Sequence, residues 1–202
     1  MKKLFFLFFL LVTSQLFLRA QTVEITPFGG YVFPTRWNAA NGSLYFDGNA
    51  MYGGSISFGV SRVLDVDFTY TRIDTKVTAE SYGFGAFDEV PLSENYYMLG
   101  FTKNFRVNLV VSPFVGFNIG GVYLAPKESG YYSYWFAAVG LDAGVKVYFS
   151  KHVGFMGQMQ LNMPVQYGGF TFYYGGAGVY VNSTLIDFGF TGGLVFRLGR
   201  VL

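Results

Sequence analysis

Apolar and polar residues alternate strictly along residues 137–149. Val139, Leu141 and Val145 belong to the apolar set, and the residues between them, such as Asp142 and Lys146, are small, charged or hydroxylated. After the short segment 150–152 the alternation resumes over residues 153–163. Successive side chains of a β-strand point to opposite faces, so this pattern predicts a hairpin with one apolar and one polar face. Each predicted strand has about ten residues or more, which is long enough to cross a bilayer when tilted.

The same alternation recurs along the chain and predicts eight strands. They cover residues 23–33, 50–60, 66–72, 93–102, 109–124, 137–149, 153–163 and 184–198. The connections 34–49, 73–92, 125–135 and 164–183 are long, and the connections 61–65, 103–108 and 150–152 are short. Long and short connections alternate, which is typical of an up-and-down barrel and not of a sandwich with Greek-key crossings. We therefore predict an all-β fold, an eight-stranded antiparallel up-and-down transmembrane β-barrel.

The composition of the two faces indicates which one points outward. The polar face is rich in Gly, Ser, Thr and Asn, which suit the narrow interior of an eight-stranded barrel. The apolar face carries aromatic residues near both strand ends, as bilayer interfaces favour. We expect Tyr31, Tyr52, Tyr70, Tyr97 and Tyr123 at the end with long loops, and Phe58, Phe101, Phe149, Phe155 and Phe196 at the end with short turns. The alternative is a lipocalin-like soluble barrel, whose apolar face points inward.

The first twenty residues have the pattern of a secretory signal peptide. Lys2 and Lys3 precede an apolar run over residues 4–12, and Ala20 offers a small residue for cleavage. We expect residues 1–20 to be the signal peptide and residues 21–202 to form the barrel. Lys2, Lys3 and Arg19 leave with the signal, so the formal net charge of +2 becomes −1 and gives no support to nucleic-acid binding. The sequence has no cysteine, which excludes a lipoprotein anchor and a disulfide framework.

Residues 112–121, 140–149 and 188–198 resemble the OmpA-like outer-membrane β-barrel proteins of Gram-negative bacteria, in particular the porin-family small barrels of Bacteroidetes. The resemblance is one of pattern and covers the whole mature chain. It implies a place in the cell outer membrane, with the loops outside and both termini in the periplasm. It also implies contact with outer-membrane lipids and lipopolysaccharide, and with the barrel-assembly machinery during biogenesis.

Catalytic chemistry finds little support in the sequence. An outer-membrane lipid-modifying enzyme of this size would need a base, usually histidine, near a serine or an acid. His152 is the only histidine, and it falls in a predicted short turn at the end opposite to that chemistry. One histidine without any cysteine also argues against a metal centre. We expect no enzymatic activity, no cofactor and no metal.

Six charged residues are predicted to point into the lumen: Glu24, Asp67, Asp142, Lys146, Asp187 and Arg197. Charges in a narrow interior are costly unless they are paired. We therefore predict a polar network that plugs the barrel, in which Lys146 or Arg197 pairs with Asp142, Asp187 or Glu24. The alternative is a narrow porin-like pore or a small-solute site.

The last long connection is unusually aromatic and almost uncharged. Its aromatic residues include Phe170, Phe172, Tyr173, Tyr174 and Tyr180. They could belong to an upward extension of the flanking strands, or to a lid over the barrel mouth. The functional interpretation is a contact surface for an extracellular protein, because exposed apolar patches commonly mark such sites. The sequence thus favours a structural or adhesion-type role.

Overall fold

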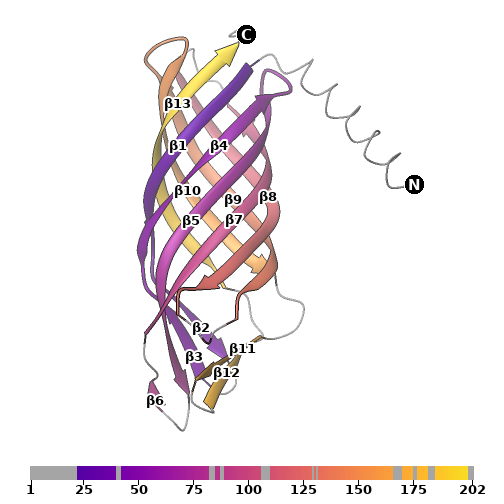
Figure 1. Ribbon diagram of the computed structural model, residues 1–202. Helices are drawn as coiled ribbons and strands as arrows, with labels where there is room; N and C mark the ends of the chain where they lie inside the picture. Colours follow the sequence, from indigo (N-terminus) through magenta and orange to yellow (C-terminus); the bar gives the residue numbers. More distant parts are fainter. Residues whose placement is uncertain are drawn as a thin grey trace, which may run out of the picture.

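Eight long antiparallel strands close into a barrel in the computed structural model, which describes residues 22–39, 42–81, 85–86, 89–105, 110–128, 130, 132–165, 170–174, 177–181 and 185–199. The strands are β1 (Thr22–Val32), β4 (Asn49–Gly59), β5 (Leu64–Ser81), β7 (Val90–Asn104), β8 (Val111–Pro126), β9 (Tyr134–Tyr148), β10 (Val153–Val165) and β13 (Asp187–Gly199). Each pairs with its neighbour in chain order, and β1 pairs with β13 to close the sheet (Figure 1). The predicted fold class is confirmed. The predicted signal peptide, residues 1–20, lies outside the described residues.

The two ends of the barrel differ. At one end, here called the turn end, short segments join β4 to β5 and β9 to β10, and β1 begins where β13 finishes (uppermost in Figure 1). The opposite, loop end carries five shorter strands: β2 (Thr35–Ala39), β3 (Gly42–Phe46), β6 (Gly85–Ala86), β11 (Phe170–Tyr174) and β12 (Ala177–Val181). In the described part of the chain, no helix is both long and apolar enough to cross a bilayer.

The apolar face of the strands points outward, as predicted. Ile56, Phe68, Leu99, Phe117 and Leu141 are 40–50% exposed on the outer surface. The alternating inward positions are polar and buried, among them Ser57, Asp67 and Asn118. This arrangement is the reverse of a soluble barrel, in which apolar side chains fill the interior.

Aromatic side chains ring the outer surface near both ends. Tyr31, Tyr52 and Tyr97 are exposed toward the loop end, and the Tyr97 ring centroid lies 5.2 Å from that of Tyr70. Trp135 also belongs to this ring, although it was not predicted there, and its ring centroid lies 5.0 Å from that of Tyr123. Phe101, Phe149, Phe155 and Phe196 are exposed toward the turn end, and Phe58 is half-buried there. The two rings bound the lipid-facing part of the barrel.

The predicted strand ends at the loop side were wrong. The connection 73–92 was expected to be a loop, but β5 runs on to Ser81 and pairs with β7 from Val90 onward. The connection 34–49 contains the hairpin β2–β3, and the connection 164–183 contains the separate hairpin β11–β12. β8 and β9 likewise extend into the connection 125–135.

The physical reason is that the pattern inverts beyond the tyrosine ring. Along β5 the inward residues become apolar, with Ile73 and Val77 each 1% exposed, while Asp74 and Lys76 point outward. Between the two aromatic rings the outer surface of the barrel meets lipid. Beyond the tyrosine ring, toward the loop end, the outer surface meets water, so the same strand exchanges its polar and apolar faces. The outward apolar pattern therefore ends near Arg72, although β5 continues to Ser81.

Inward apolar side chains at the loop end form one cluster, the loop-end plug: Val32, Leu44, Phe46, Met51, Ile73, Val77, Ala79, Leu92, Tyr96, Met98, Val122, Leu124, Ala138 and Leu185. Leu44 comes from β3, and Leu92 and Val122 come from barrel strands. The plug therefore joins the sheet extension beyond the ring to the barrel itself. Leu44, Leu92 and Val122 are at most 1% exposed.

Candidate functional site

Glu24 is the centre of a buried group of charges near the turn end of the lumen. Lys146 Nζ lies 2.7 Å from Glu24 Oε2, and Arg197 Nε lies 2.8 Å from Glu24 Oε1. The Tyr148 hydroxyl donates a hydrogen bond of 2.8 Å to Glu24 Oε1. Glu24, Lys146 and Arg197 are at most 9% exposed. The structure thus brings together three of the six charged residues predicted for the lumen, and it makes Glu24 the partner of both cations.

Further groups complete this turn-end ion cluster. The Arg197 guanidinium lies 3.7 Å from the centre of the Tyr148 ring, within the range of a cation–π contact. Asp65 Oδ2 lies 3.9 Å from Lys146 Nζ and accepts a 2.7 Å hydrogen bond from Asn104 Nδ2. Asp65 and Asn104 are not among the predicted lumen residues, because both fall in the predicted short connections 61–65 and 103–108. Extending the alternation by one more inward position would have found both, because Asp65 precedes Asp67 by two residues on β5 and Asn104 follows Thr102 by two residues on β7.

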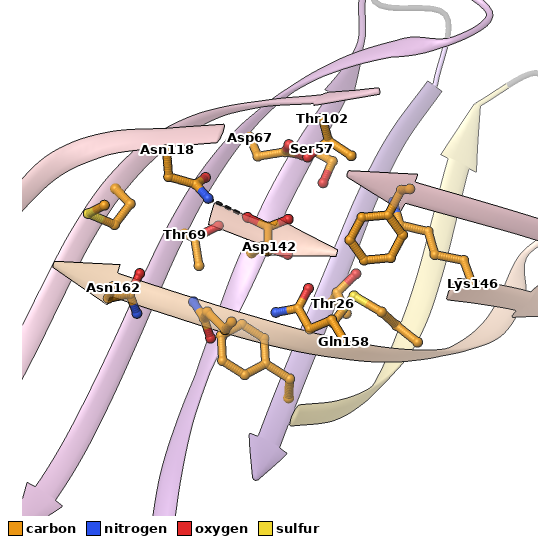
Figure 2. A pocket seen from close by; sticks show the side chains of 16 residues that line it. Thr26, Ser57, Asp67, Thr69, Thr102, Asn118, Asp142, Lys146, Gln158 and Asn162 are labelled. Carbon is orange, nitrogen blue, oxygen red and sulfur yellow. Dashed lines mark hydrogen bonds between the residues drawn. The ribbon is translucent and has the colours of Figure 1, made fainter. Parts of the chain in front are cut away.

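Asp67 and Asp142 lie on the wall of a central cavity, which Lys146 of the turn-end ion cluster also lines (Figure 2). Asn118 donates a hydrogen bond to Asp142 Oδ1. The cavity has about 30 Å³ of space for the centres of water molecules, which is enough for about two of them. Its lining consists of Thr26, Phe28, Ser55, Ser57, Asp67, Thr69, Met98, Thr102, Phe114, Asn118, Asp142, Lys146, Met156, Gln158, Gln160 and Asn162.

Inward glycines make room for these polar side chains. A Cβ atom at Gly116 would lie 2.3 Å from Asp142 Oδ2, and one at Gly100 would lie 2.1 Å from Asn118 Oδ1. Either distance is far below van der Waals contact. The glycines of the polar face thus decide where Asp142 and Asn118 can lie.

Asp187, the last of the six predicted residues, belongs to a third group near the loop end. It accepts a hydrogen bond from the Tyr96 hydroxyl, and the Glu94 carboxyl lies within hydrogen-bonding reach. Glu94 is 1% exposed and Asp187 is 5% exposed. The lumen therefore holds three polar groups along its length, and Lys146 is shared by the first two. Glu94 and Tyr96 are not among the predicted lumen residues, because the inward face of β7 mixes polar and apolar residues.

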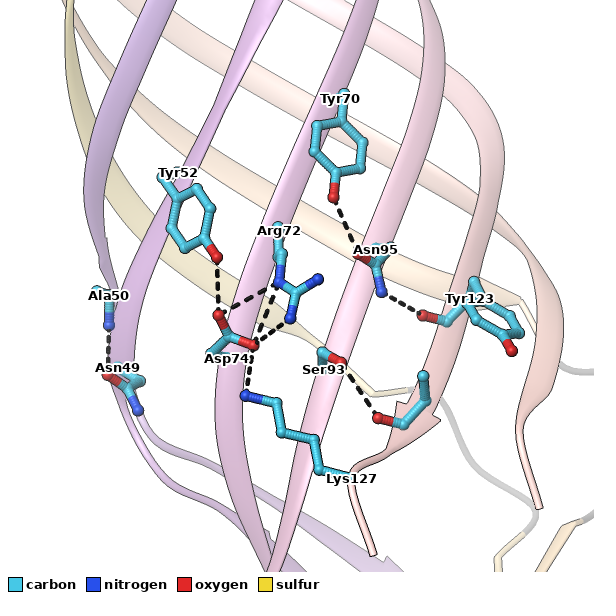
Figure 3. A network of polar contacts seen from close by, with 11 residues as sticks. Asn49, Ala50, Tyr52, Tyr70, Arg72, Asp74, Ser93, Asn95, Tyr123 and Lys127 are labelled. Atoms are coloured by element: carbon cyan, nitrogen blue, oxygen red, sulfur yellow. Dashed lines mark hydrogen bonds and ion pairs between the residues drawn. The ribbon is translucent and has the colours of Figure 1, made fainter. Parts of the chain in front are cut away.

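A polar network also lies outside the barrel, at the loop-end edge of the tyrosine ring (Figure 3). Asp74 accepts hydrogen bonds from Arg72 Nη2 at 2.9 Å and from the Tyr52 hydroxyl at 2.9 Å, and it lies 2.8 Å from Lys127 Nζ. The hydrogen bonds from Arg72, with weaker ones from Lys127 and Tyr52, hold the pKa of Asp74 well below its usual range. The network fixes β5 to β4 and to the end of β8.

The remaining predicted residues lie elsewhere. His152 is exposed in the turn between β9 and β10, and its backbone carbonyl accepts a 2.7 Å hydrogen bond from the Arg197 amide. In the described part of the chain, no group of three or more His, Cys, Asp or Glu residues is placed to hold a metal ion. Phe170, Phe172, Tyr173, Tyr174 and Tyr180 lie on the backbone of β11 and β12, but their side chains are outside what the structure describes. β12 lies beside β2, β3 and β5.

Comparison with known proteins supports the architecture. No protein-family model and no curated protein matches the sequence. The chain is similar to the outer membrane protein OprG from Pseudomonas aeruginosa, with a TM-score of 0.62 and 11% identity over 90% of this chain and 98% of that chain. Neisserial surface protein A matches with a TM-score of 0.59 and 12% identity, over 89% and 97% of the two chains. Ail, the attachment invasion locus protein of Yersinia pestis, matches with a TM-score of 0.51 and 10% identity, over 88% and 97%. At these identities the likeness shows the fold alone, which is that of the small outer-membrane β-barrels.

Proposed function

We propose that this protein is a non-enzymatic outer-membrane barrel that anchors a surface-interaction module. The signal peptide, residues 1–20, directs export, and the loop end faces the outside while both termini of the mature chain face the periplasm. The surrounding partners are outer-membrane lipids and lipopolysaccharide, with the barrel-assembly machinery acting during insertion. The fold and the apolar outer surface support this placement.

The observation that carries the proposal is the extension of the sheet beyond the tyrosine ring. β5 and β7 continue past the ring, β3 adds to the end of β5, and the inward face there is an apolar core. A barrel that only filled the membrane would need no such extension. A stable sheet in water is a rigid support for contact residues, and exposed aromatic loops suit contact with a protein surface. The name of Ail describes attachment for that protein.

The contact residues we propose are the aromatic residues of the hairpin β11–β12: Phe170, Phe172, Tyr173, Tyr174 and Tyr180. Replacing residues 169–180 with a short Gly-Ser linker should abolish binding to the extracellular partner and leave the barrel folded. Binding is measured on bacterial cells that display either form, against host-cell and matrix-protein surfaces. Heat-modifiable migration in gels reports the folded barrel. Unchanged binding by the shortened protein would contradict the adhesion role.

A narrow pore is the second candidate, because the lumen has a polar wall. Two observations favour a closed lumen. The loop-end plug fills the loop end of the lumen with side chains that are at most 8% exposed. Glu24, Lys146 and Arg197 meet across the lumen near the turn end. The free space next to that ion cluster is only about 10 Å³, which is at the lower limit for one water molecule.

Planar-bilayer recordings of the refolded protein separate the two candidates. We expect no steady conductance. A steady conductance that changes when Lys146 is replaced by Met would favour the pore. Lys103→Met is the matched control, because Lys103 is exposed on the outer surface.

A further inference from the structure

The central cavity contains buried oxygen atoms that have no partner. Asp67 Oδ2, Gln160 Oε1 and Thr26 Oγ1 form no hydrogen bond among the described residues. All three residues line the cavity, and they are 6%, 5% and 1% exposed. Buried polar atoms in proteins almost always have a partner, so three such oxygens around one cavity point to a bound species.

The charges around the cavity are also unbalanced. Lys146 and Arg197 are the inward-pointing cations of the described strands, and both lie against Glu24. Lys146 lines the cavity, but its ammonium group lies 2.7 Å from Glu24 Oε2 and 3.9 Å from Asp65 Oδ2. No cation of the described residues is within ion-pair distance of Asp67 or Asp142, and Asn118 donates to only one oxygen of Asp142. Two carboxylates in a narrow interior are costly unless a positive charge compensates them.

The donor atoms indicate the chemistry of the missing partner. They are two carboxylates, an amide oxygen and a hydroxyl, which are the ligands that hard cations prefer. Zinc would favour His or Cys ligands, and neither lines the cavity. Mg²⁺ demands near-ideal octahedral geometry and keeps its waters, whereas Ca²⁺ accepts an irregular set of protein oxygens. The site therefore fits Ca²⁺ best.

We propose that the central cavity is a calcium site. Asp67 and Asp142 supply its negative charge, and Gln160 Oε1 and Thr26 Oγ1 supply neutral oxygens. The bound ion would hold β1, β5, β9 and β10 together from inside the barrel, since each strand contributes one of these residues. In the closed lumen proposed above, the ion would enter during folding.

The test is refolding from urea in a zwitterionic detergent without lipopolysaccharide, in buffer with Ca²⁺ or with EDTA. After gel filtration in calcium-free buffer, elemental analysis should find about one Ca²⁺ per folded wild-type chain. The double variant Asp67→Asn/Asp142→Asn should retain none. Asp74→Asn, which removes an acid at the outer rim, is the matched control and should retain as much as the wild type. Mg²⁺ supplied in place of Ca²⁺ should not be taken up during refolding, because it gives up its waters reluctantly.

Unfolding by urea supplies a second readout. Ca²⁺ should raise the unfolding midpoint of the wild type and leave that of the double variant unchanged. In EDTA the double variant should be the more stable protein, because it lacks the two uncompensated charges. If it fails to fold, Thr26→Val and Gln160→Met test the same site at constant charge, and each should retain less Ca²⁺ than the wild type. No retained calcium in the wild type, or equal retention in the variants, would mean a cavity holding water only and would overturn the proposal.

Discussion

At the scale of single residues, Glu24 organises the turn end of the lumen. Its two carboxylate oxygens accept hydrogen bonds from Lys146, Arg197 and the Tyr148 hydroxyl. Removing one partner of a buried ion pair is costly because the other charge is left without compensation. The cost should therefore depend on how many charges each substitution leaves unpaired.

Glu24→Gln should destabilise the barrel more than Lys146→Met. The first substitution leaves two buried cations without their shared carboxylate, and the second leaves Glu24 still paired with Arg197. We expect a loss of about 3–5 kcal/mol for Glu24→Gln and roughly half of that for Lys146→Met. Equilibrium urea unfolding in detergent micelles measures both. The reverse order would show that Glu24 is not the centre of the cluster.

Asp74, at the outer rim, should make a pH-dependent contribution to the stability of the fold. Its pKa is lowered in the folded protein, so its contacts stabilise the fold above the usual carboxyl pKa of about 3.9, and this stabilisation is lost as the pH falls below that value. At pH 7, Asp74→Asn should cost about 1 kcal/mol. The difference between the two proteins should shrink steadily in acid. Unfolding midpoints between neutral pH and strong acid measure it, and a constant difference would contradict the assignment.

At the scale of single strands, neighbouring positions face opposite surroundings. Gly53 and Gly54 are adjacent on β4, and Gly53 points inward while Gly54 points outward. A Cβ atom at Gly53 would lie 2.0 Å from the Tyr70 carbonyl oxygen, whereas one at Gly54 would lie 3.6 Å from the nearest atom. The close approach of β4 to β5 on the inner side thus requires glycine at one of the two positions only.

Gly53→Ala should therefore cost about 1–3 kcal/mol, because the backbone of β5 must shift. Gly54→Ala serves as its control and should change stability by less than about 0.5 kcal/mol. Urea unfolding and the yield of heat-modifiable protein both report the difference. Equal effects of the two substitutions would mean that the inner contact is absent.

The exchange of faces along β5 gives a second prediction for an element. Phe68 and Thr78 both point outward on this strand. Phe68 lies between the two aromatic rings, and Thr78 lies beyond the tyrosine ring toward the loop end. Phe68→Lys places a charge in lipid and should cost about 2–4 kcal/mol. Thr78→Lys places the charge in water and should cost less than about 1 kcal/mol. Refolding equilibria in lipid vesicles compare the two, and a similar cost at both sites would place the membrane boundary elsewhere.

At the scale of the whole molecule, the barrel and its extension share one core. The loop-end plug contains Leu44 from β3 together with Leu92 and Val122 from barrel strands. Neither part can lose its packing without exposing apolar side chains of the other. Cooperative unfolding is the expected consequence.

The two tryptophans can test this cooperativity. Trp37 lies on β2 in the extension, and Trp135 lies on β9 at the tyrosine ring. Trp37→Phe and Trp135→Phe each leave one fluorescent reporter. Their urea transitions should coincide with each other and with the loss of β-structure measured by circular dichroism. An earlier transition of the Trp37 reporter would show that the extension unfolds by itself.

The alternation along the sequence determined the number of long strands, their order and the face that points to lipid. These are local properties, because side chains alternate with a period of two and each lipid-facing strand must carry its own apolar side. The alternation also placed six charges on the inward face. It held no information on which of them meet.

The tertiary structure decided the contacts and the strand ends. Glu24 meets Lys146 from 122 positions away and Arg197 from 173 positions away, and only the closure and stagger of the barrel bring them together. The same closure leaves Asp67 and Asp142 on a shared cavity and Asp187 beside Tyr96. The continuation of β5 past Arg72 also depends on tertiary structure. Residues 73–81 keep an alternation in which Ile73, Val77 and Ala79 share one face. Only the pairing with β7 and β3 and the packing of the loop-end plug show that this apolar face points inward.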